Sequence, residues 1–376
     1  MVTAKSIVCV ECGEKYSPNE NIYRCRKCNG SLDIVYDYDK IKDVIVTESF
    51  LREHPWHWKY WMFYPVVDLS NKVTLMEGGT PLIKSHYFSN ENLDVWLKYE
   101  GMNPTGSFKD RGTSVEVTKA IELGMKEVCC ASTGNMGASV AAYCGKAGIR
   151  CRIFLPRNAS GIKIKQIMAY GAKIDKTSKN YPDAVKLCLK YSRKNKSYLM
   201  GDYPYRGEGQ KSVGFEIADQ MNWNVPDFIV CPIGNGTLIY AVWDALNDLK
   251  KVKLVEKLPK MIGIQAEGCS PVIKAFKKGS KKIEPIKKPR TFAFAIECGD
   301  PLDGQKALNA LRNSKGFGET VTDKEILFIL KLLAKKEGLY VEPAGAVSLA
   351  GMLKIKENLN GSAVCVLTGH GLKDPY

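Results

Sequence analysis

Short apolar segments alternate with amphipathic ones from about residue 94 to the end of the chain. The apolar segments are rich in Val, Ile and Cys and end at or directly before Gly, Pro or Ser, which is typical of buried strands. They cover residues 95–100, 127–132, 150–156, 228–234, 261–268 and 363–369. The segments between them, such as 183–195 and 323–338, repeat apolar positions at helical spacing. Strands that alternate with helices predict an α/β fold with parallel sheets.

Length and composition narrow the class of protein. At 376 residues the chain is long enough for two domains, and 45% hydrophobic with 25% charged residues is ordinary for a globular protein. It has no apolar run of membrane-spanning length and no charged-then-apolar leader. Thirteen cysteines, many within apolar segments, are typical of buried free thiols rather than of a secreted disulfide framework. We therefore expect a soluble cytoplasmic protein with no membrane partner.

The formal net charge of +15 raises the question of a nucleic-acid partner. Much of the excess lies in two lysine-rich segments, residues 250–260 and 274–290. These segments lack the interleaved aromatic residues expected of a base-stacking surface. We interpret them as solvated loops, so nucleic acid is not the expected partner.

Four cysteines lie within the first forty residues. Cys9 and Cys12 form one C-x2-C pair, and Cys25 and Cys28 form a second, twelve residues later. Four thiolates at this spacing fill the tetrahedral coordination of zinc and leave no open position for catalysis. The pattern predicts a structural zinc in a zinc-ribbon-like knuckle, with iron as the alternative metal.

An aromatic-rich segment follows and contains His54 and His57. An H-x2-H pair suggests a metal site, but the three tryptophans beside it favour a packed connector with the histidines as polar tips.

In parallel α/β folds, ligands gather beyond the carboxyl ends of the strands. One loop at such a position, residues 101–112, places Lys109 after a Gly/Pro/Thr/Ser turn and at the expected start of a helix. The positive end of the helix dipole disfavours a protonated amine, which suits a nucleophile. A solvated surface lysine is the alternative interpretation.

Two further loops have the chemistry of anion sites. Ser132, Thr133 and Asn135 lie between a strand and a helix, where hydroxyls and free N–H groups can hold a carboxylate. Residues 232–237 contain two glycines that allow a close backbone approach, and they lack the further residues of a dinucleotide fingerprint or a P-loop. A single phosphate group fits this third loop. A lysine nucleophile, a phosphate loop and a carboxylate loop together predict pyridoxal phosphate and an amino-acid substrate.

A series of motifs occurs in the order found in one enzyme family. They are EGGTPL, NPTGSFKDRG, STGNMGAS, EGQK, GNGT, QAEG, EPAGAVSLAGM and TGHGLKDP. From about Cys9 to the C-terminus the chain resembles threonine synthases, which are pyridoxal phosphate enzymes of fold type II, similar to the tryptophan synthase β chain. A cysteate synthase-like relative is also compatible, since a cysteine-rich knuckle resembles those of both groups.

The resemblance implies roles for individual residues. Lys109 would carry the cofactor as a Schiff base and then move protons at the substrate carbons, and Phe108 would line the ring face. Asn135 would contact the ring hydroxyl, and Thr368 the pyridine nitrogen. The cofactor phosphate loop would be Gly234, Asn235, Gly236 and Thr237.

The resemblance also implies domain bounds and a second copy of the chain as partner. The expected parts are a knuckle at 1–40, a connector at 41–93 packed on the large domain, a small α/β domain with Lys109 at 94–205, and a large α/β domain with the phosphate loop at 206–376. We expect a homodimer.

The substrate subsite departs from the family pattern. Met136, Met200, Gly201, Tyr203 and Phe294 stand where we expect hydroxyl or amide contacts with a substrate phosphate. The candidate substrate contacts that remain are Ser132, Thr133, Arg206 and Lys211.

The implied reaction is that of threonine synthase, in which O-phosphohomoserine loses phosphate and water adds at Cβ. The alternatives are a cysteate synthase-like β-replacement on O-phosphoserine with sulfite, and a threonine or serine dehydratase. Because methionine, glycine and phenylalanine side chains cannot donate hydrogen bonds to a phosphate dianion, we hypothesise that O-phosphohomoserine is turned over poorly and that a different β- or γ-substituted amino acid is preferred.

Overall fold

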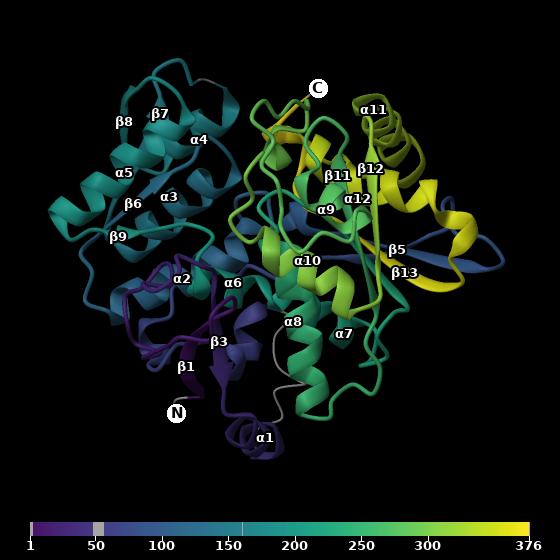
Figure 1. Cartoon of the computed structure of the whole chain (residues 1–376), viewed down its shortest axis with the longest axis horizontal. Coiled ribbons are helices and arrows are strands. Elements are labelled where there is room, and N and C mark those ends of the chain that lie inside the picture. The colour runs from purple at the N-terminus through teal and green to yellow at the C-terminus, as the bar shows by residue number, and fades with distance from the viewer. Residues whose placement is uncertain (1–2, 48–55, 160, 376) are drawn as a thin grey trace. The chain divides into compact units, whose positions relative to one another are not determined.

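The computed structural model describes residues 3–47, 56–159 and 161–375. The chain divides into two compact units, each with its own sheet (Figure 1). Within the described ranges, the first unit comprises residues 3–47, 56–77 and 103–209, and the second comprises residues 78–102 and 210–375. The α/β class expected from the sequence is confirmed.

The first unit is built around a four-stranded parallel sheet with the order β8-β7-β6-β9. The strands are β6 (Glu127–Ala131), β7 (Arg150–Pro156), β8 (Lys173–Ser178) and β9 (Tyr198–Leu199). The helices are α2 (Lys109–Glu122), α3 (Asn135–Ala147), α4 (Ile162–Ala169), α5 (Tyr181–Asn195) and α6 (Pro204–Gln210). Helices α3 and α5 pack on the sheet, where Figure 1 shows them beside β6 and β7.

The N-terminal part of this unit is a small antiparallel sheet followed by a helix. The sheet has the order β2-β1-β3, and its members are β1 (Ala4–Cys9), β2 (Lys15–Tyr16) and β3 (Leu32–Tyr36). Helix α1 (Tyr38–Thr47) comes next in sequence. After it, the 3-10 helices η2 (His57–Phe63) and η3 (Leu69–Asn71) belong to the first unit, and η2 buries His57 and Trp58.

The second unit contains a six-stranded sheet with the order β12-β11-β10-β13-β5-β4. All its neighbours are parallel except the edge pair of β4 (Leu82–Ser85) and β5 (Leu93–Tyr99). The other strands are β10 (Phe228–Pro232), β11 (Lys260–Ala266), β12 (Phe317–Val321) and β13 (Gly361–Leu367). The helices are α7 (Ser212–Gln220), α8 (Thr237–Lys251), α9 (Pro271–Lys277), α10 (Gly304–Asn313), α11 (Asp323–Leu332) and α12 (Pro343–Lys354). The residues of β10 are all buried, which explains its continuous apolar sequence.

Local sequence signals set several helix ends. Thr322 and Glu325 form a reciprocal capping box at the start of α11. Asn180 caps α5, and the left-handed Lys196 ends it.

The six strands expected from the sequence all lie in the two sheets. Strands β8 and β12 were not expected, because their polar, partly exposed residues carry no apolar run. We expected residues 94–205 to form one domain, but β5 lies in the sheet of the second unit, where it pairs with β13 over seven residues. His54 lies outside the described residues. Within the described ranges, no helix combines the length and apolarity needed to cross a bilayer.

Candidate active site

Lys109 is the first residue of α2, as expected from its turn-like approach. Asp110 holds this turn, since its carboxylate accepts bonds of 2.7 Å and 2.6 Å from the N–H and hydroxyl of Thr105. Burial raises the pKa of Asp110 to about 6, although hydrogen bonds from Ser139 and Thr105 act in the opposite direction. The Lys109 Nζ lies 4.7 Å from the ring centroid of Phe108 and 3.6 Å from Oδ1 of Asp202. The amine is thus bracketed by an aromatic face and a carboxylate.

The second expected loop follows β6 and begins α3. The Ser132 hydroxyl accepts hydrogen bonds from the N–H groups of Gly134 and Gly137, so it caps the helix. A Cβ on Gly137 would lie 2.5 Å from the Ser132 carbonyl oxygen, which explains the glycine. Thr133 is half-buried and Asn135 is buried at the helix start.

Arg206 does not present a free charge in the first unit. Its side chain is fully buried, with Nη2 2.7 Å from Oε2 of Glu116, and its Nε donates to the Gly201 carbonyl at 3.0 Å. Its Nη1 donates to the Thr113 hydroxyl at 3.0 Å. Burial alone would lower the pKa of Arg206, but the carboxylates of Glu116 and Asp202 raise it. This geometry favours a structural role over the expected contact with a substrate anion.

Four of the five residues that depart from the family pattern lie in the first unit, whereas Phe294 lies in the second unit and is exposed. Met200 is buried, and a Cβ on Gly201 would lie 2.6 Å from the ring of Tyr203. The Gly201 N–H donates to Glu116 Oε1 at 3.2 Å. Met136 is half-buried. The backbone of this segment is therefore fixed by close packing, and these side chains add no charged group.

In the second unit, the expected phosphate loop joins β10 to α8. Gly236 has φ +96°, and a Cβ there would lie 2.6 Å from the Asp303 carbonyl oxygen. A Cβ on Gly234 would lie 3.2 Å from the Cα of Ile296. The N-cap residue of α8 is Gly236, which has no side chain to cap the helix, and the N–H groups of its first turn point as in helix-terminal anion sites. The loop has the shape and donors that a phosphate group needs.

Two other members of the predicted set in the second unit have different surroundings. Thr368 is buried just after β13. Lys211 is buried between two carboxylates of α8, 2.6 Å from Asp244 and 2.9 Å from Asp248. Its charge is compensated within the unit, which does not favour the expected contact with substrate. The Thr237 hydroxyl donates to Asp303 at 2.8 Å, and Asn235 accepts a bond of 2.9 Å from the Cys298 thiol.

The four N-terminal cysteines come together as their spacing predicts. One sulfur from each of Cys9, Cys12, Cys25 and Cys28 lies within 4.8 Å of the others. Cys9 and Cys28 are 3.4 Å apart, and Cys12 and Cys25 are 3.5 Å apart. Four sulfurs at this separation fit a tetrahedral metal site.

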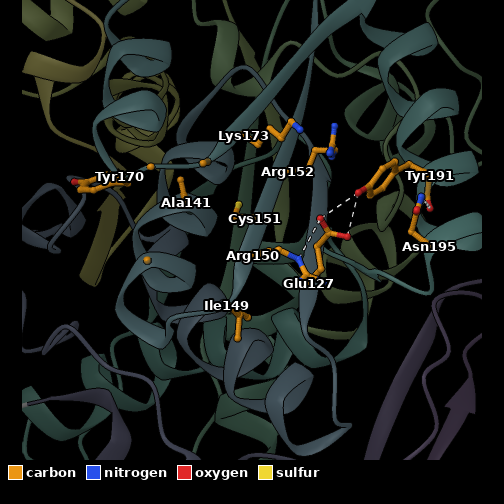
Figure 2. Close-up of a pocket in the computed structure, with 13 residues that line it drawn as sticks. Glu127, Ala141, Ile149, Arg150, Cys151, Arg152, Tyr170, Lys173, Tyr191 and Asn195 are labelled. Carbon is orange, nitrogen blue, oxygen red and sulfur yellow. Dashed lines mark hydrogen bonds and ion pairs between the residues drawn. The ribbon is translucent and has the colours of Figure 1, made fainter.

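A pocket of about 530 Å³ lies in the first unit at the amino ends of β6, β7 and β8 (Figure 2). Glu127, Arg150 and Lys173 begin these strands, and the Arg152 guanidinium lies 4.5 Å from the centroid of the Tyr191 ring. The helices α3 and α5 end nearby, so the basic side chains complement the negative ends of the helix dipoles. Lys109 and residues 132–135 follow the carboxyl ends of strands, so this pocket is not the expected ligand site.

Comparisons with known proteins agree with the chemistry of these loops. Residues 73–369 match the family described as pyridoxal-phosphate dependent enzyme. Threonine synthases from Methanocaldococcus jannaschii and Methanosarcina acetivorans are 44% and 47% identical, over 98% of this chain and 92% of each relative. The structures of maize serine racemase and of a fungal L-serine ammonia-lyase from Rhizomucor miehei match with TM-scores of 0.68 and 0.67, at 23% and 21% identity. They cover 77% of this chain and 88% and 93% of their own chains, and they show the shared fold. The chain belongs to the family of pyridoxal-phosphate dependent enzymes of fold type II.

Proposed function

We propose that this enzyme is a threonine synthase that converts O-phosphohomoserine to threonine by loss of phosphate and addition of water at Cβ. The observation that carries the proposal is the 44–47% identity, over nearly the whole chain, to relatives named threonine synthase. The lysine at the start of α2 and the glycine at the N-cap of α8 support the cofactor chemistry.

The residues of the family motifs would hold the cofactor. Lys109 would bind it covalently, Phe108 would face its ring, and Asn135 would contact the ring hydroxyl. The loop from Gly234 to Thr237 would bind the phosphate, and Thr368 would face the ring nitrogen. The bound cofactor supplies the electron sink that stabilises negative charge at the substrate Cα.

Lys109 is also the proposed proton carrier. As a free amine, Lys109 would remove the Cα proton of the substrate and return a proton later in the reaction. The N–H groups and hydroxyls of Ser132 and Thr133 would orient the substrate carboxylate. We assign structural roles to Arg206 in the first unit and to Lys211 in the second, because each is buried in an ion pair.

The small number of side-chain donors near Arg206 supports a second candidate reaction, the β-replacement of O-phosphoserine with sulfite. Met200 and Gly201 supply no side-chain donor, and the nearby Arg206 is already bound to Glu116. A subsite with few donors favours a smaller substrate or a phosphate placed nearer the cofactor. Product analysis with both substrates separates the two reactions.

We further propose that the four cysteines bind one structural zinc ion, since four sulfur ligands leave no position for water. Metal analysis of the purified protein should give about one zinc per chain. A homodimer and a cytoplasmic location remain predictions, and sedimentation velocity tests the first of them.

The test of the cofactor assignment is spectroscopic and chemical. The purified protein should absorb in the visible region, and borohydride should fix the cofactor on Lys109, as found by peptide mapping. Lys109→Ala should fold normally, lose the label and lose at least about a thousandfold in turnover. A label on another lysine contradicts the assignment.

A further inference from the structure

We propose that Asp202 is a positioning residue for Lys109, whose carboxylate acts as the counter-ion of the lysine amine and favours its protonated form. This inference deepens the proposed function and depends on Lys109 being the lysine that binds the cofactor. The sequence motif that contains Lys109 does not predict this partner, because Asp202 follows Lys109 by 93 residues.

The contact is short enough for a strong charge interaction and too long for a direct hydrogen bond. Asp202 Oδ1 lies 3.6 Å from Lys109 Nζ, and the two side chains are 3% and 19% exposed. At such low exposure, solvent screens the attraction much less than at the surface. The lysine amine is therefore held near the carboxylate by charge, without a direct hydrogen bond to Oδ1.

The fold fixes Asp202 through its neighbours in the chain. Arg206, four residues later and within α6, donates to the carbonyl of Gly201, the residue directly before Asp202. The Gly201 N–H in turn donates to Glu116, and Glu116 pairs with Arg206 at 2.7 Å. Both peptide groups of Gly201, on the N-terminal side of Asp202, are therefore bonded to buried charged side chains.

Glu116 and Lys109 belong to the same helix. They are seven residues apart on α2, which places them on one face, two turns from each other. That face of α2 contacts residues 200–206. Positively and negatively charged side chains alternate there, in the order Lys109, Asp202, Arg206 and Glu116. Burial raises the pKa of Glu116 to about 7 against the effect of Arg206. Asp110, the neighbour of Lys109, is turned away to Thr105.

Two opposing fields act on the lysine as a result. The start of α2 is the positive end of a helix dipole and disfavours an ammonium group. The Asp202 carboxylate favours the ammonium group by a direct charge interaction. A residue that must both form a covalent bond as a free amine and donate a proton as an ammonium benefits from this balance. Asp202 adjusts that balance without touching the substrate.

The test compares the native enzyme with Asp202→Asn, which keeps the shape and removes the charge. The visible absorbance of the holoenzyme is titrated with pH, and its midpoint should move to lower pH by about one unit in the variant. In the apoenzyme at neutral pH, Lys109 should then condense with pyridoxal about tenfold faster, measured by reduction and peptide mapping.

The controls separate charge from structure. Asp202→Glu retains the charge and should keep a midpoint near the native one. Asp175→Asn removes a carboxylate of the same unit that bonds only to Thr177 in the described structure, and should change nothing. A native-like midpoint in Asp202→Asn with normal cofactor loading overturns the role of Asp202 and leaves the proposed function standing. If the native chain carries no label on Lys109, the proposed function fails and this role fails with it.

Discussion

At the scale of single residues, the sequence identified groups by type and local motif but not their distant partners. The helix start at Lys109 could be predicted, because its turn residues are adjacent in the chain. The ion pairs of Arg206 and Lys211 could not, because Glu116, Asp244 and Asp248 come from other elements. A buried arginine and an exposed one have the same sequence signature.

Gly236 gives a direct test of the phosphate loop. Gly236→Ala should weaken cofactor binding by at least about tenfold, because it forces a residue with a Cβ into left-handed backbone against the Asp303 carbonyl, at a cost of about 1–2 kcal/mol. Equilibrium dialysis or fluorescence titration of the apoenzyme measures the change.

A matched control distinguishes the loop from general backbone strain. Gly279 also has a positive φ, +66°, and a Cβ there would meet no described atom within 4 Å. Gly279→Ala carries similar strain and should bind the cofactor normally. Equal weakening in both variants would contradict the assignment of the phosphate loop.

Glu77 predicts a pH-dependent stability of the first unit. Its carboxylate is buried and accepts from Tyr143 at 2.6 Å, with His57 Nε2 also 2.6 Å away. Burial alone would raise its pKa, but the His57 charge and the hydrogen bonds lower it to about 2. Its contribution to stability is therefore fully present above about pH 4.3 and is lost as the pH falls towards 2.

Glu77→Gln should lower the stability of the unit by about 3 kcal/mol at pH 7, because it leaves the buried His57 without its charged partner. The thermal midpoint should fall by roughly 5–10 °C at pH 7. The difference from the native protein should shrink as the pH is lowered from 4 to 2. Glu256→Gln, an exposed control, should have the native midpoint at every pH. A difference that does not vary with pH would argue against an ionised Glu77.

At the scale of elements, apolar strands could be read from the sequence and polar edge strands could not. Strands β10 and β13 are buried along nearly their whole length and stand out as apolar runs. Strands β8 and β12 lie at sheet edges and are partly exposed, so nothing in their composition distinguishes them from loops.

The cysteine module, residues 3–36 with the four clustered cysteines, contacts residues 198–208, which include Asp202 and Arg206. The Tyr205 hydroxyl donates to the carbonyls of Pro18 and Glu20 at 2.9 Å and 2.8 Å. The Leu199 N–H donates to the Tyr23 hydroxyl at 3.0 Å, and Tyr36 donates to Glu208 at 2.7 Å. Because of these contacts, we expect residues 198–208 to become less ordered when the cysteine module becomes less ordered.

Loss of the metal should therefore destabilise residues 198–208. In Cys12→Ser we expect lower zinc content, because one of four ligands is removed, and faster amide exchange in residues 198–208. Hydrogen exchange with mass spectrometry measures the second effect, and Cys298→Ser in the second unit is the control. Unchanged exchange in a zinc-depleted protein would show that the module and the segment are independent.

At the scale of the whole molecule, the sequence predicted two α/β domains but divided the chain too simply. A division into consecutive segments misses that residues 78–102 belong to the second unit, while Trp56–Glu77 belongs to the first. The reason is strand pairing. The apolar strand β5 lies between β4, which directly precedes it in sequence, and β13, which is distant in sequence, and its backbone bonds to both. Apolar patterns report burial and not the identity of the neighbour.

Substrate choice depends on the complete enzyme, and the two candidate reactions give opposite results in one experiment. We expect the specificity constant for O-phosphohomoserine to exceed that for O-phosphoserine with sulfite, in line with the threonine synthases that the chain resembles over nearly its full length. We also expect it to lie below about 10⁴ M⁻¹s⁻¹, the lower end for well-adapted enzymes, since Met136, Met200 and Gly201 supply no side-chain donor to a phosphate. Threonine and cysteate are measured side by side with the same preparation. A higher constant for O-phosphoserine would establish the β-replacement reaction, because the phosphate would then leave from the carbon next to Cα.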